Sequence, residues 1–263
     1  MNVLKACDPR PDILKGTFNP EIFTASLGGV MKHYRGQAPG IHSIYTDTDQ
    51  FFSEATYPTE GLKMVLAEVF ARLSGDTNTP AIHRLETAFG GGKTHTLIAC
   101  AHLGFKGREL ADVTGGIIDG IDLHEPGSVA VVGVVGDELP VHKPVGTALV
   151  PYTLWGEIAF QVGGEALYQK VQAEAESPAA PGKSYFEAVL GGRRVLLMLD
   201  ELAQYAARLA AANPQNSDQL AAFLMGLHGY ARSNPGIAVV LTLAGAKDAL
   251  PIRPQNWRTC SAR

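Results

Sequence analysis

The chain has 263 residues, of which 46% are hydrophobic, and its formal net charge is −4. This length and apolar content suit one globular α/β domain with an appended segment. The net charge gives no sign of a nucleic-acid-binding surface, although it leaves room for a local basic patch. No apolar run approaches the length of a bilayer span, and residues 1–8 lack the apolar core of a signal peptide, so no membrane partner is expected.

The cysteines are few and scattered. Cys7, Cys100 and Cys260 are widely spaced and odd in number, and they fit no metal-ligand pattern. The simplest interpretation is a protein of the reducing cytoplasm.

Residues 1–58 form an N-terminal extension in our division of the chain. They are rich in Pro, Gly, Asp and Thr and show no sustained period, which favours irregular structure packed on a core. Short helical stretches are expected near residues 21–32 and 48–54. We assign residues 59–250 to the core domain and 251–263 to a tail.

The core domain is expected to begin with an amphipathic helix. Thr59 is a good N-cap residue, and the pattern ends at Gly75 and Asp76. Six apolar residues between them are spaced as one face of a helix. They are Leu62, Val65, Leu66, Val69, Phe70 and Leu73.

A triple glycine followed by Lys-Thr-His stands between an expected strand at 81–87 and an expected helix at 93–102. Strand, glycine loop, Lys-Thr and helix is the arrangement with which proteins hold the phosphates of a nucleoside triphosphate. Glycines allow positive φ angles, and the helix N-terminus adds partial positive charge. The ATP-binding residues that we predict are Phe89, Gly90, Gly91, Gly92, Lys93, Thr94 and His95.

The individual roles follow from this geometry. Lys93 would reach the β- and γ-phosphates and serve both binding and catalysis, and the Thr94 hydroxyl would ligate Mg²⁺. His95 is a candidate contact to the nucleotide or the loop backbone, with a position on the helix surface as the alternative. The motif departs from G-x-x-x-x-G-K-[ST] at Thr87, where a glycine is usual. A flexible loop that happens to precede a helix is therefore the other interpretation.

Two further strands supply acidic residues. The apolar run 127–135 predicts a strand followed by Asp137 and Glu138 at the edge where ligands bind. After an interrupted helix at 154–173, with its break at Gly163 and Gly164, and a short helix at 185–190, the run 194–199 predicts a buried strand.

This third strand ends in two acids, Asp200 and Glu201. We expect Asp200 to hold Mg²⁺ through water and Glu201 to orient and polarise the attacking water. The alternative is that both acids only cap the helix that follows.

Two helices, ending near 212 and spanning 218–232, precede a fourth strand at 237–243. Asn213 and Pro214 mark the break between them. Thr242 is the polar residue near the end of this strand, and in ATPases of the additional-strand type such a residue senses the γ-phosphate. A threonine is also common in ordinary strands.

The order β-α-β-α-β-α-β predicts a mostly parallel sheet with right-handed crossovers. The expected fold is α/β: a three-layer α/β/α P-loop NTPase of the additional-strand, AAA+-like type. Core domains of this kind usually have a fifth strand, and AAA+ proteins add a helical lid. Neither is visible in the tail, so we expect the sequence to be incomplete at its C-terminus.

Four stretches resemble a bacterial and archaeal family of large predicted AAA+ ATPases, catalogued as domain of unknown function 499. They are residues 85–97, 153–159 together with Gly163 and Gly164, 199–205, and 11–16. The resemblance covers nearly the whole chain except its last residues. Family members are longer, which supports the expectation of truncation. They often lie beside DNA methyltransferase-like genes in defence or restriction-like clusters, which implies a DNA-acting complex with DNA and such a methyltransferase as partners.

The expected function is an ATPase with ATP and Mg²⁺ as cofactors. Oligomeric members of this class complete the site with an arginine from a neighbouring copy; Arg232, Arg253 and Arg258 are candidates, each of which is otherwise a solvated surface charge. The alternative is a regulatory or scaffold module that binds nucleotide without turnover. A small-molecule kinase lacks an evident acceptor site. A GTPase is disfavoured because Lys247-Asp248 is not the Asn-Lys-x-Asp arrangement.

Overall fold

A four-stranded, all-parallel sheet forms the centre of the computed structural model, which describes residues 11–17, 20, 24–87, 90–146 and 148–244. The strand order is β1-β4-β3-β2, so the strand that comes last in the sequence lies between β1 and β3. The strands are β1 (Ile82–Thr87), β2 (Ala130–Val135), β3 (Val195–Asp200) and β4 (Ile237–Ala244). The predicted α/β class with a parallel sheet is confirmed.

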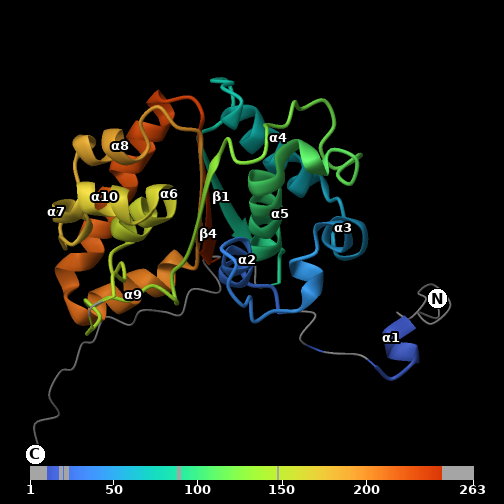
Figure 1. Cartoon of the computed structure of the whole chain (residues 1–263), viewed down its shortest axis with the longest axis horizontal. Coiled ribbons are helices and arrows are strands. Elements are labelled where there is room, and N and C mark those ends of the chain that lie inside the picture. Colours follow the sequence, from blue (N-terminus) through green and yellow to red (C-terminus); the bar gives the residue numbers. More distant parts are fainter. Residues whose placement is uncertain (1–10, 18–19, 21–23, 88–89, 147, 245–263) are drawn as a thin grey trace, which may run out of the picture.

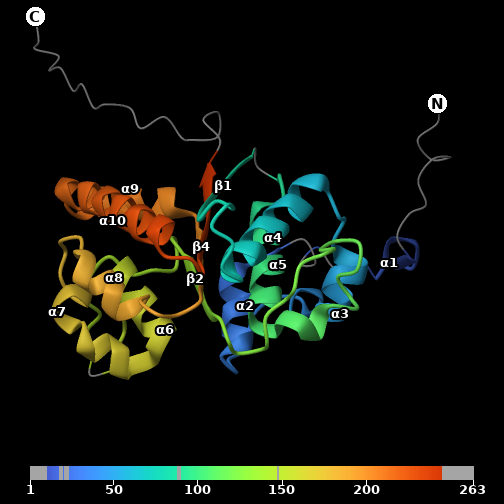
Figure 2. The same ribbon diagram turned by 90° about the horizontal axis from the view of Figure 1, so that it is seen from above.

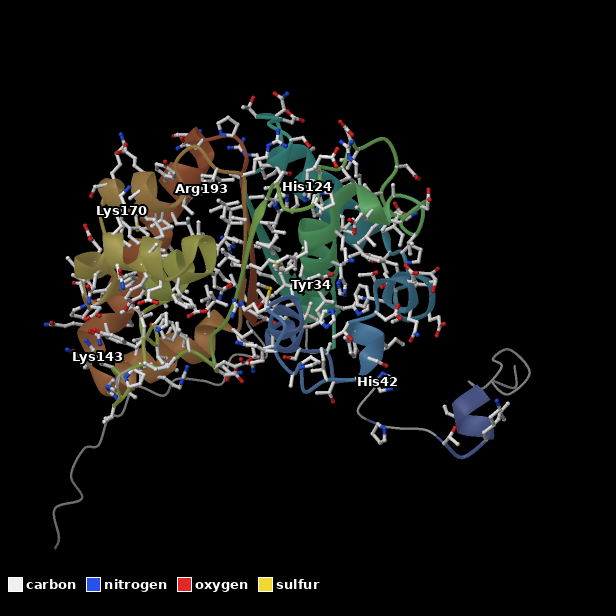
Figure 3. The ribbon with its side chains drawn as sticks, viewed as in Figure 1. Tyr34, His42, His124, Lys143, Lys170 and Arg193 are labelled. Atoms are coloured by element: carbon white, nitrogen blue, oxygen red, sulfur yellow. The ribbon has the colours of Figure 1, made fainter. Side chains whose placement is uncertain are left out.

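Helices cover both faces of this sheet (Figures 1 and 2). One face carries α2 (Leu27–Tyr34), α4 (Glu60–Leu73) and α5 (Lys93–Lys106). The other carries α6 (Leu154–Lys170), α8 (Lys183–Val189), α9 (Leu202–Ala212) and α10 (Pro214–Ser233), with α7 (Gln172–Ala175) beside α6. Figure 3 shows the same division in the side chains: Tyr34 and His124 lie on the α5 side, whereas Lys143 and Lys170 lie on the α6 side.

The packing of strand β3 explains why five of its six residues are apolar. All six of its residues are buried, because alternate side chains enter two separate cores. Leu196 and Met198 pack with the α5 side, whereas Leu197 and Leu199 pack with the α6–α10 side.

The N-terminal extension contributes to the first of these cores. Its described part includes α1 (Pro11–Leu14), α2, a 3₁₀ turn at Ser43–Tyr45, α3 (Thr48–Gln50) and a π-helical turn at Phe51–Ala55. Val30, Met31 and Phe51 are almost completely buried against the α5 side. Helical structure thus occurs in both regions where the sequence predicted it, and the extension helps to cover α5.

The capping and breaking residues act as predicted at α4 and α6. The Thr59 hydroxyl accepts a hydrogen bond from the Leu62 N–H at 3.2 Å, and all six residues of the predicted apolar face of α4 are buried. In α6 the helical backbone is interrupted at Gly163 and Gly164.

The predicted starts and ends of two helices were wrong by several residues. Helix α5 continues to Lys106 and not 102. Helix α10 starts at Pro214 and not 218, because Asn213 is its N-cap and proline is well tolerated in the first turn. The predicted break is present at Asn213, which lies between α9 and α10, but Pro214 already belongs to α10.

No helix in the part of the chain that the structure describes combines the length and apolar character needed to cross a bilayer. Phe89, Arg253, Arg258 and the Lys247-Asp248 pair lie outside the described residues, as does the predicted tail at 251–263.

Candidate functional site

The glycine loop leads from β1 directly into the N-terminus of α5. Gly90 and Gly92 have φ angles of 79° and 74°, a left-handed conformation that favours glycine over any residue with a Cβ. Gly92 is the N-cap of α5, and its carbonyl accepts the first helical hydrogen bond, from the Thr96 N–H at 2.9 Å. The three glycines are exposed, and Lys93 and Thr94 are partly buried in the first turn. The loop therefore presents a helix N-terminus with small residues around it, which suits an anion.

Thr94 and Asp200 meet at the edge of the sheet. The Thr94 hydroxyl donates to Asp200 Oδ2 at 3.0 Å, although the two residues are 106 positions apart in the sequence. Asp200 is the last residue of β3 and only 4% exposed. The predicted metal ligands thus come from two different elements and lie within hydrogen-bond distance of each other.

Thr242 completes this arrangement from the neighbouring strand. Because β4 lies beside β3, its hydroxyl donates to Asp200 Oδ1 at 2.5 Å. Thr242 is 3% exposed. Asp200 therefore accepts a hydroxyl hydrogen bond on each of its two oxygens, and this places three of the predicted site residues together.

Glu201 has an unusual backbone. Its φ of 53° and ψ of 33° are left-handed, and among the described residues it is the only one other than glycine with a positive φ. Such a conformation costs about 1–2 kcal/mol for a residue with a Cβ. The Glu201 N–H donates to Asp200 Oδ1 and to Thr242 Oγ1, both at 3.1 Å. These two hydrogen bonds help to hold the strained conformation.

The Glu201 carboxylate lies among polar groups. It accepts a hydrogen bond from the Gln204 side-chain amide at 2.9 Å. Partial burial raises the pKa of this carboxyl, and the negative charges of Asp137 and Asp200 raise it further. The structure thus brings Asp137, predicted at this edge, into the neighbourhood of Glu201. A raised pKa makes Glu201 a stronger base than a solvated carboxylate.

His95 lies between α5 and the N-terminal extension. Its Nε2 is 2.9 Å from the Thr56 hydroxyl, and its ring stacks on Phe51 with a centroid distance of 4.5 Å. Burial lowers its pKa, which favours the neutral ring. These contacts account for a histidine at this position, and a contact to nucleotide stays a prediction.

Three contributors to this edge were not predicted from the sequence: Gly136, Gln204 and Arg208. Arg208 donates from Nη2 to the carbonyls of Gly136 and of Leu139, the latter at 2.6 Å. A sequence signal for it exists, since Arg208 is the only charged residue in the alanine-rich helix α9. Gln204 lies in the stretch 199–205 that resembles the family, whereas Gly136 carries no comparable signal.

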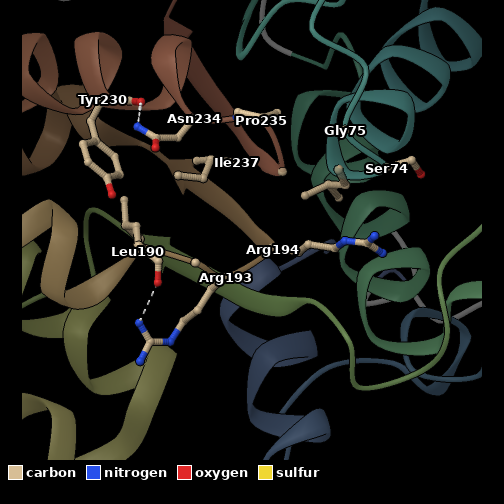
Figure 4. Close-up of a pocket in the computed structure, with 13 residues that line it drawn as sticks. Ser74, Gly75, Leu190, Arg193, Arg194, Tyr230, Asn234, Pro235 and Ile237 are labelled. Carbon is tan, nitrogen blue, oxygen red and sulfur yellow. Dashed lines mark hydrogen bonds between the residues drawn. The ribbon is translucent and has the colours of Figure 1, made fainter.

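A cavity of about 340 Å³ lies at the opposite edge of the sheet, where β3 and β4 begin (Figure 4). Helices α4, α8 and α10 all end there, and their C-termini carry partial negative charge. Arginine side chains satisfy two of these ends: Arg193 donates to the carbonyls of Ala188 and Val189, both at 3.2 Å, and Arg72 donates to that of Ala231 at 2.7 Å. Arg232, one arginine-finger candidate, is exposed at the end of α10 on this same edge. Helix capping thus accounts for Arg193 in this cavity, whose lining does not include Asp200.

A second cavity, of about 320 Å³, lies between α9 and residues 141–143. It is lined by Tyr205 and Leu209 of α9, among others. It therefore lies along α9, the helix that follows Glu201.

The geometry defines an α/β protein with a parallel sheet and a polar, strained cluster at the carboxyl ends of its strands. A family model described as the DUF499 N-terminal domain matches residues 4–256, and the chain belongs to this family. Neither a curated protein nor a solved structure matches the chain.

Proposed function

We propose that this chain is a P-loop ATPase of the additional-strand, AAA+-like type that binds ATP with Mg²⁺ and hydrolyses it. The observation that carries the proposal is the 3.0 Å hydrogen bond between the Thr94 hydroxyl and Asp200. It joins the first turn after the glycine loop to the end of β3, where a nucleotide phosphate and its metal would have to meet. The ordinary alternatives for the two motifs, a flexible loop and a helix cap, give no reason for these side chains to be in contact.

The strand order supports the same proposal. Insertion of β4 between β1 and β3 puts Thr242 beside Asp200. In ATPases of the additional-strand type, a polar residue at this place senses the γ-phosphate. Ligands of open parallel sheets bind at the carboxyl ends of the strands, which is the edge where these residues lie.

The residues present fit Mg²⁺. Thr94 and Asp200 offer a hydroxyl and a carboxylate, which are hard oxygen ligands. Among the described residues there is no group of three or more His, Cys, Asp or Glu side chains that could hold a metal by itself. Mg²⁺ needs no such group, since it is commonly held by one or two carboxylates together with substrate phosphates and water. The ion would neutralise phosphate charge at Thr94 and Asp200.

Glu201 would act as the general base. In the proposed reaction a water oxygen bonds to the γ-phosphorus, the bond to the β–γ bridging oxygen breaks, and Glu201 accepts the water proton. Lys93 would balance charge on the β- and γ-phosphates. The hydrogen bonds from the Glu201 N–H to Asp200 and Thr242 would hold this base at a fixed position relative to Asp200, one of the proposed metal ligands.

Binding of ATP tests the first half of the proposal. Lys93→Ala should abolish binding of Mg²⁺–ATP, measured by isothermal titration calorimetry. Lys106→Ala, at the other end of the same helix, is the matched control and should bind as the wild type does. Equal affinities in the two variants would contradict the phosphate-loop assignment.

The wider role rests on the family resemblance. We propose that the ATPase acts in the cytoplasm as the motor or switch of a DNA-acting, defence or restriction-like complex, as a homo-oligomer with a methyltransferase-like partner. Turnover measured with and without double-stranded DNA, at a stated salt concentration, tests this role. Stimulation by DNA would support it, and an unchanged rate would favour remodelling of proteins.

A further inference from the structure

A short turn after β2 lies directly against the backbone of Glu201. The Gly136 N–H donates to the Asp200 carbonyl at 2.8 Å, and the Glu138 N–H donates back to the Val135 carbonyl at 3.1 Å. The hydrogen bond from Gly136 extends the pairing of β2 with β3 by one residue, so the turn 136–139 lies beside Asp200. Its position is tied to the same residue, Asp200, that precedes Glu201.

The contact between this turn and Glu201 is too close for any side chain at position 136. A Cβ on Gly136 would lie 2.3 Å from the Glu201 carbonyl oxygen and 3.2 Å from Tyr205 Cβ. Because the obstructing atom is backbone, it could move only if Glu201 itself moved. The turn thus abuts the one described non-glycine residue with a left-handed backbone.

Arg208 fastens the turn to α9. It lies about two helical turns after Glu201, is partly buried, and uses a single nitrogen, Nη2, for both the Gly136 and the Leu139 carbonyls. Hydrogen bonds from a charged donor are stronger than those between neutral groups. The Nε–H of Arg208 is buried and has no hydrogen-bond partner among the described residues. The orientation of the guanidinium is thus set by the two carbonyls.

We propose that Arg208 is a positioning residue for ATP hydrolysis. It holds the 136–139 turn against α9, and the turn together with Thr242 keeps the Glu201 backbone in its left-handed conformation. Arg208 does not touch the reacting atoms, and its two acceptors are backbone carbonyls. This inference rests on the proposed function only in naming hydrolysis as the step that is served.

The two hydrogen bonds that Arg208 donates to the Gly136 and Leu139 carbonyls suggest a conservative substitution that should restore activity. Since one nitrogen makes both hydrogen bonds and Nε makes none, a lysine ammonium could serve the two carbonyls without losing a further partner. Methionine would keep an apolar stem but donate nothing. Arg193 offers the matched control, because it also donates to backbone carbonyls but lies at the opposite edge of the sheet.

Steady-state kinetics with ATP test the proposal on the full chain. Arg208→Met should lower kcat roughly tenfold, as expected for a displaced catalytic group, with KM changed less than about twofold because the phosphate loop is untouched. Arg208→Lys should recover kcat to within about threefold of wild type, and Arg193→Met should change neither constant. Equal kcat in Arg208→Met and wild type would overturn the proposal. So would a parallel change of kcat and KM that follows the loss of thermal stability.

A backbone measurement separates this inference from the proposed function. The three-bond HN–Hα coupling and the Cα chemical shift of Glu201 report its φ by NMR. They should indicate a left-handed residue in wild type and Arg208→Lys, and a change in Arg208→Met and in Gly136→Ala. A left-handed Glu201 in all four proteins would overturn the inference. Absence of ATP binding and turnover in wild type would contradict the proposed function, and the NMR result would still decide the role of Arg208.

Discussion

The two edges of the sheet differ in what their polar side chains do. At the edge where β3 and β4 begin, the Arg72 and Arg193 guanidinium groups donate to carbonyls at helix C-termini. At the edge where the strands end, hydroxyls and carboxylates bond to one another around Asp200, and Glu201 is held in a strained conformation. The first edge uses arginine side chains to satisfy carbonyls at helix ends, whereas the second gathers side-chain oxygens from three different elements around Asp200. Substitutions at the two edges should therefore have separable effects on stability and on turnover.

A large effect on turnover is expected at Asp200. Asp200→Asn keeps the size of the side chain but removes the charge that we propose for Mg²⁺, so the hydrolysis rate should fall on the order of 10²-fold. The Mg²⁺ concentration needed for half-maximal rate should rise. Both are measured in a phosphate-release assay with Mg²⁺ titration. An unchanged Mg²⁺ requirement would remove Asp200 from the metal site.

Substitution of Arg72 should lower stability and leave turnover unchanged. It is 2% exposed, and its Nη2 donates to the Ala231 carbonyl at 2.7 Å and to the Arg232 carbonyl at 3.2 Å. Arg72→Met leaves buried carbonyls unpaired, so the free energy of unfolding should fall by about 3 kcal/mol. Urea denaturation measures this loss, while turnover per folded molecule should stay at the wild-type value. A loss of turnover without a loss of stability would contradict the contrast between the edges.

Thr242 should have a smaller effect on turnover than Asp200. Thr242→Val keeps the shape of the side chain but removes the hydroxyl that bonds to Asp200 and accepts the Glu201 N–H. A decrease in kcat of roughly tenfold is expected, with Thr242→Ser close to wild type. Steady-state kinetics of the two variants decide this, and equal rates for valine and serine would show that the hydroxyl has no role.

The smallest effect is expected for the hydrogen bond that caps the N-terminus of α4. Thr59→Ala removes the hydrogen bond from the Leu62 N–H to the Thr59 hydroxyl and should cost about 1 kcal/mol of stability. Thr59→Asp is the control that restores a capping oxygen. The denaturation midpoint should fall in the first variant and recover in the second, with turnover unchanged in both. A change in turnover would show that α4 is coupled to the site.

Much of the candidate site could be predicted from the sequence because its chemistry is local. The glycines before Lys93, and the acid at the end of an apolar strand, can be recognised as site candidates from a few neighbouring residues. Thr242 could be singled out because it is the polar residue near the end of an apolar strand, but its position beside Asp200 depends on the strand order, which only the structure shows. The α/β class and the parallel sheet followed from the sequence order of the elements.

Contacts between distant segments were beyond sequence reasoning. The hydrogen bonds from Arg208 to the 136–139 turn depend on how α9 packs against the end of β2. No periodicity of the sequence predicts this packing. The same holds for the position of His95 against Phe51 and Thr56. The sequence predicted that the extension packs on the core, but the contacts of Phe51 and Thr56 with α5 became evident only in three dimensions.

The most direct test of the account compares wild type and Glu201→Gln in two assays on the same preparations: calorimetric binding of Mg²⁺–ATP and release of phosphate. Glu201→Gln should bind ATP as tightly as the wild type and release phosphate about 10²-fold more slowly, because the base is lost and the pocket is kept. Equal phosphate release by the two proteins, or no ATP binding by the wild type, would contradict the account.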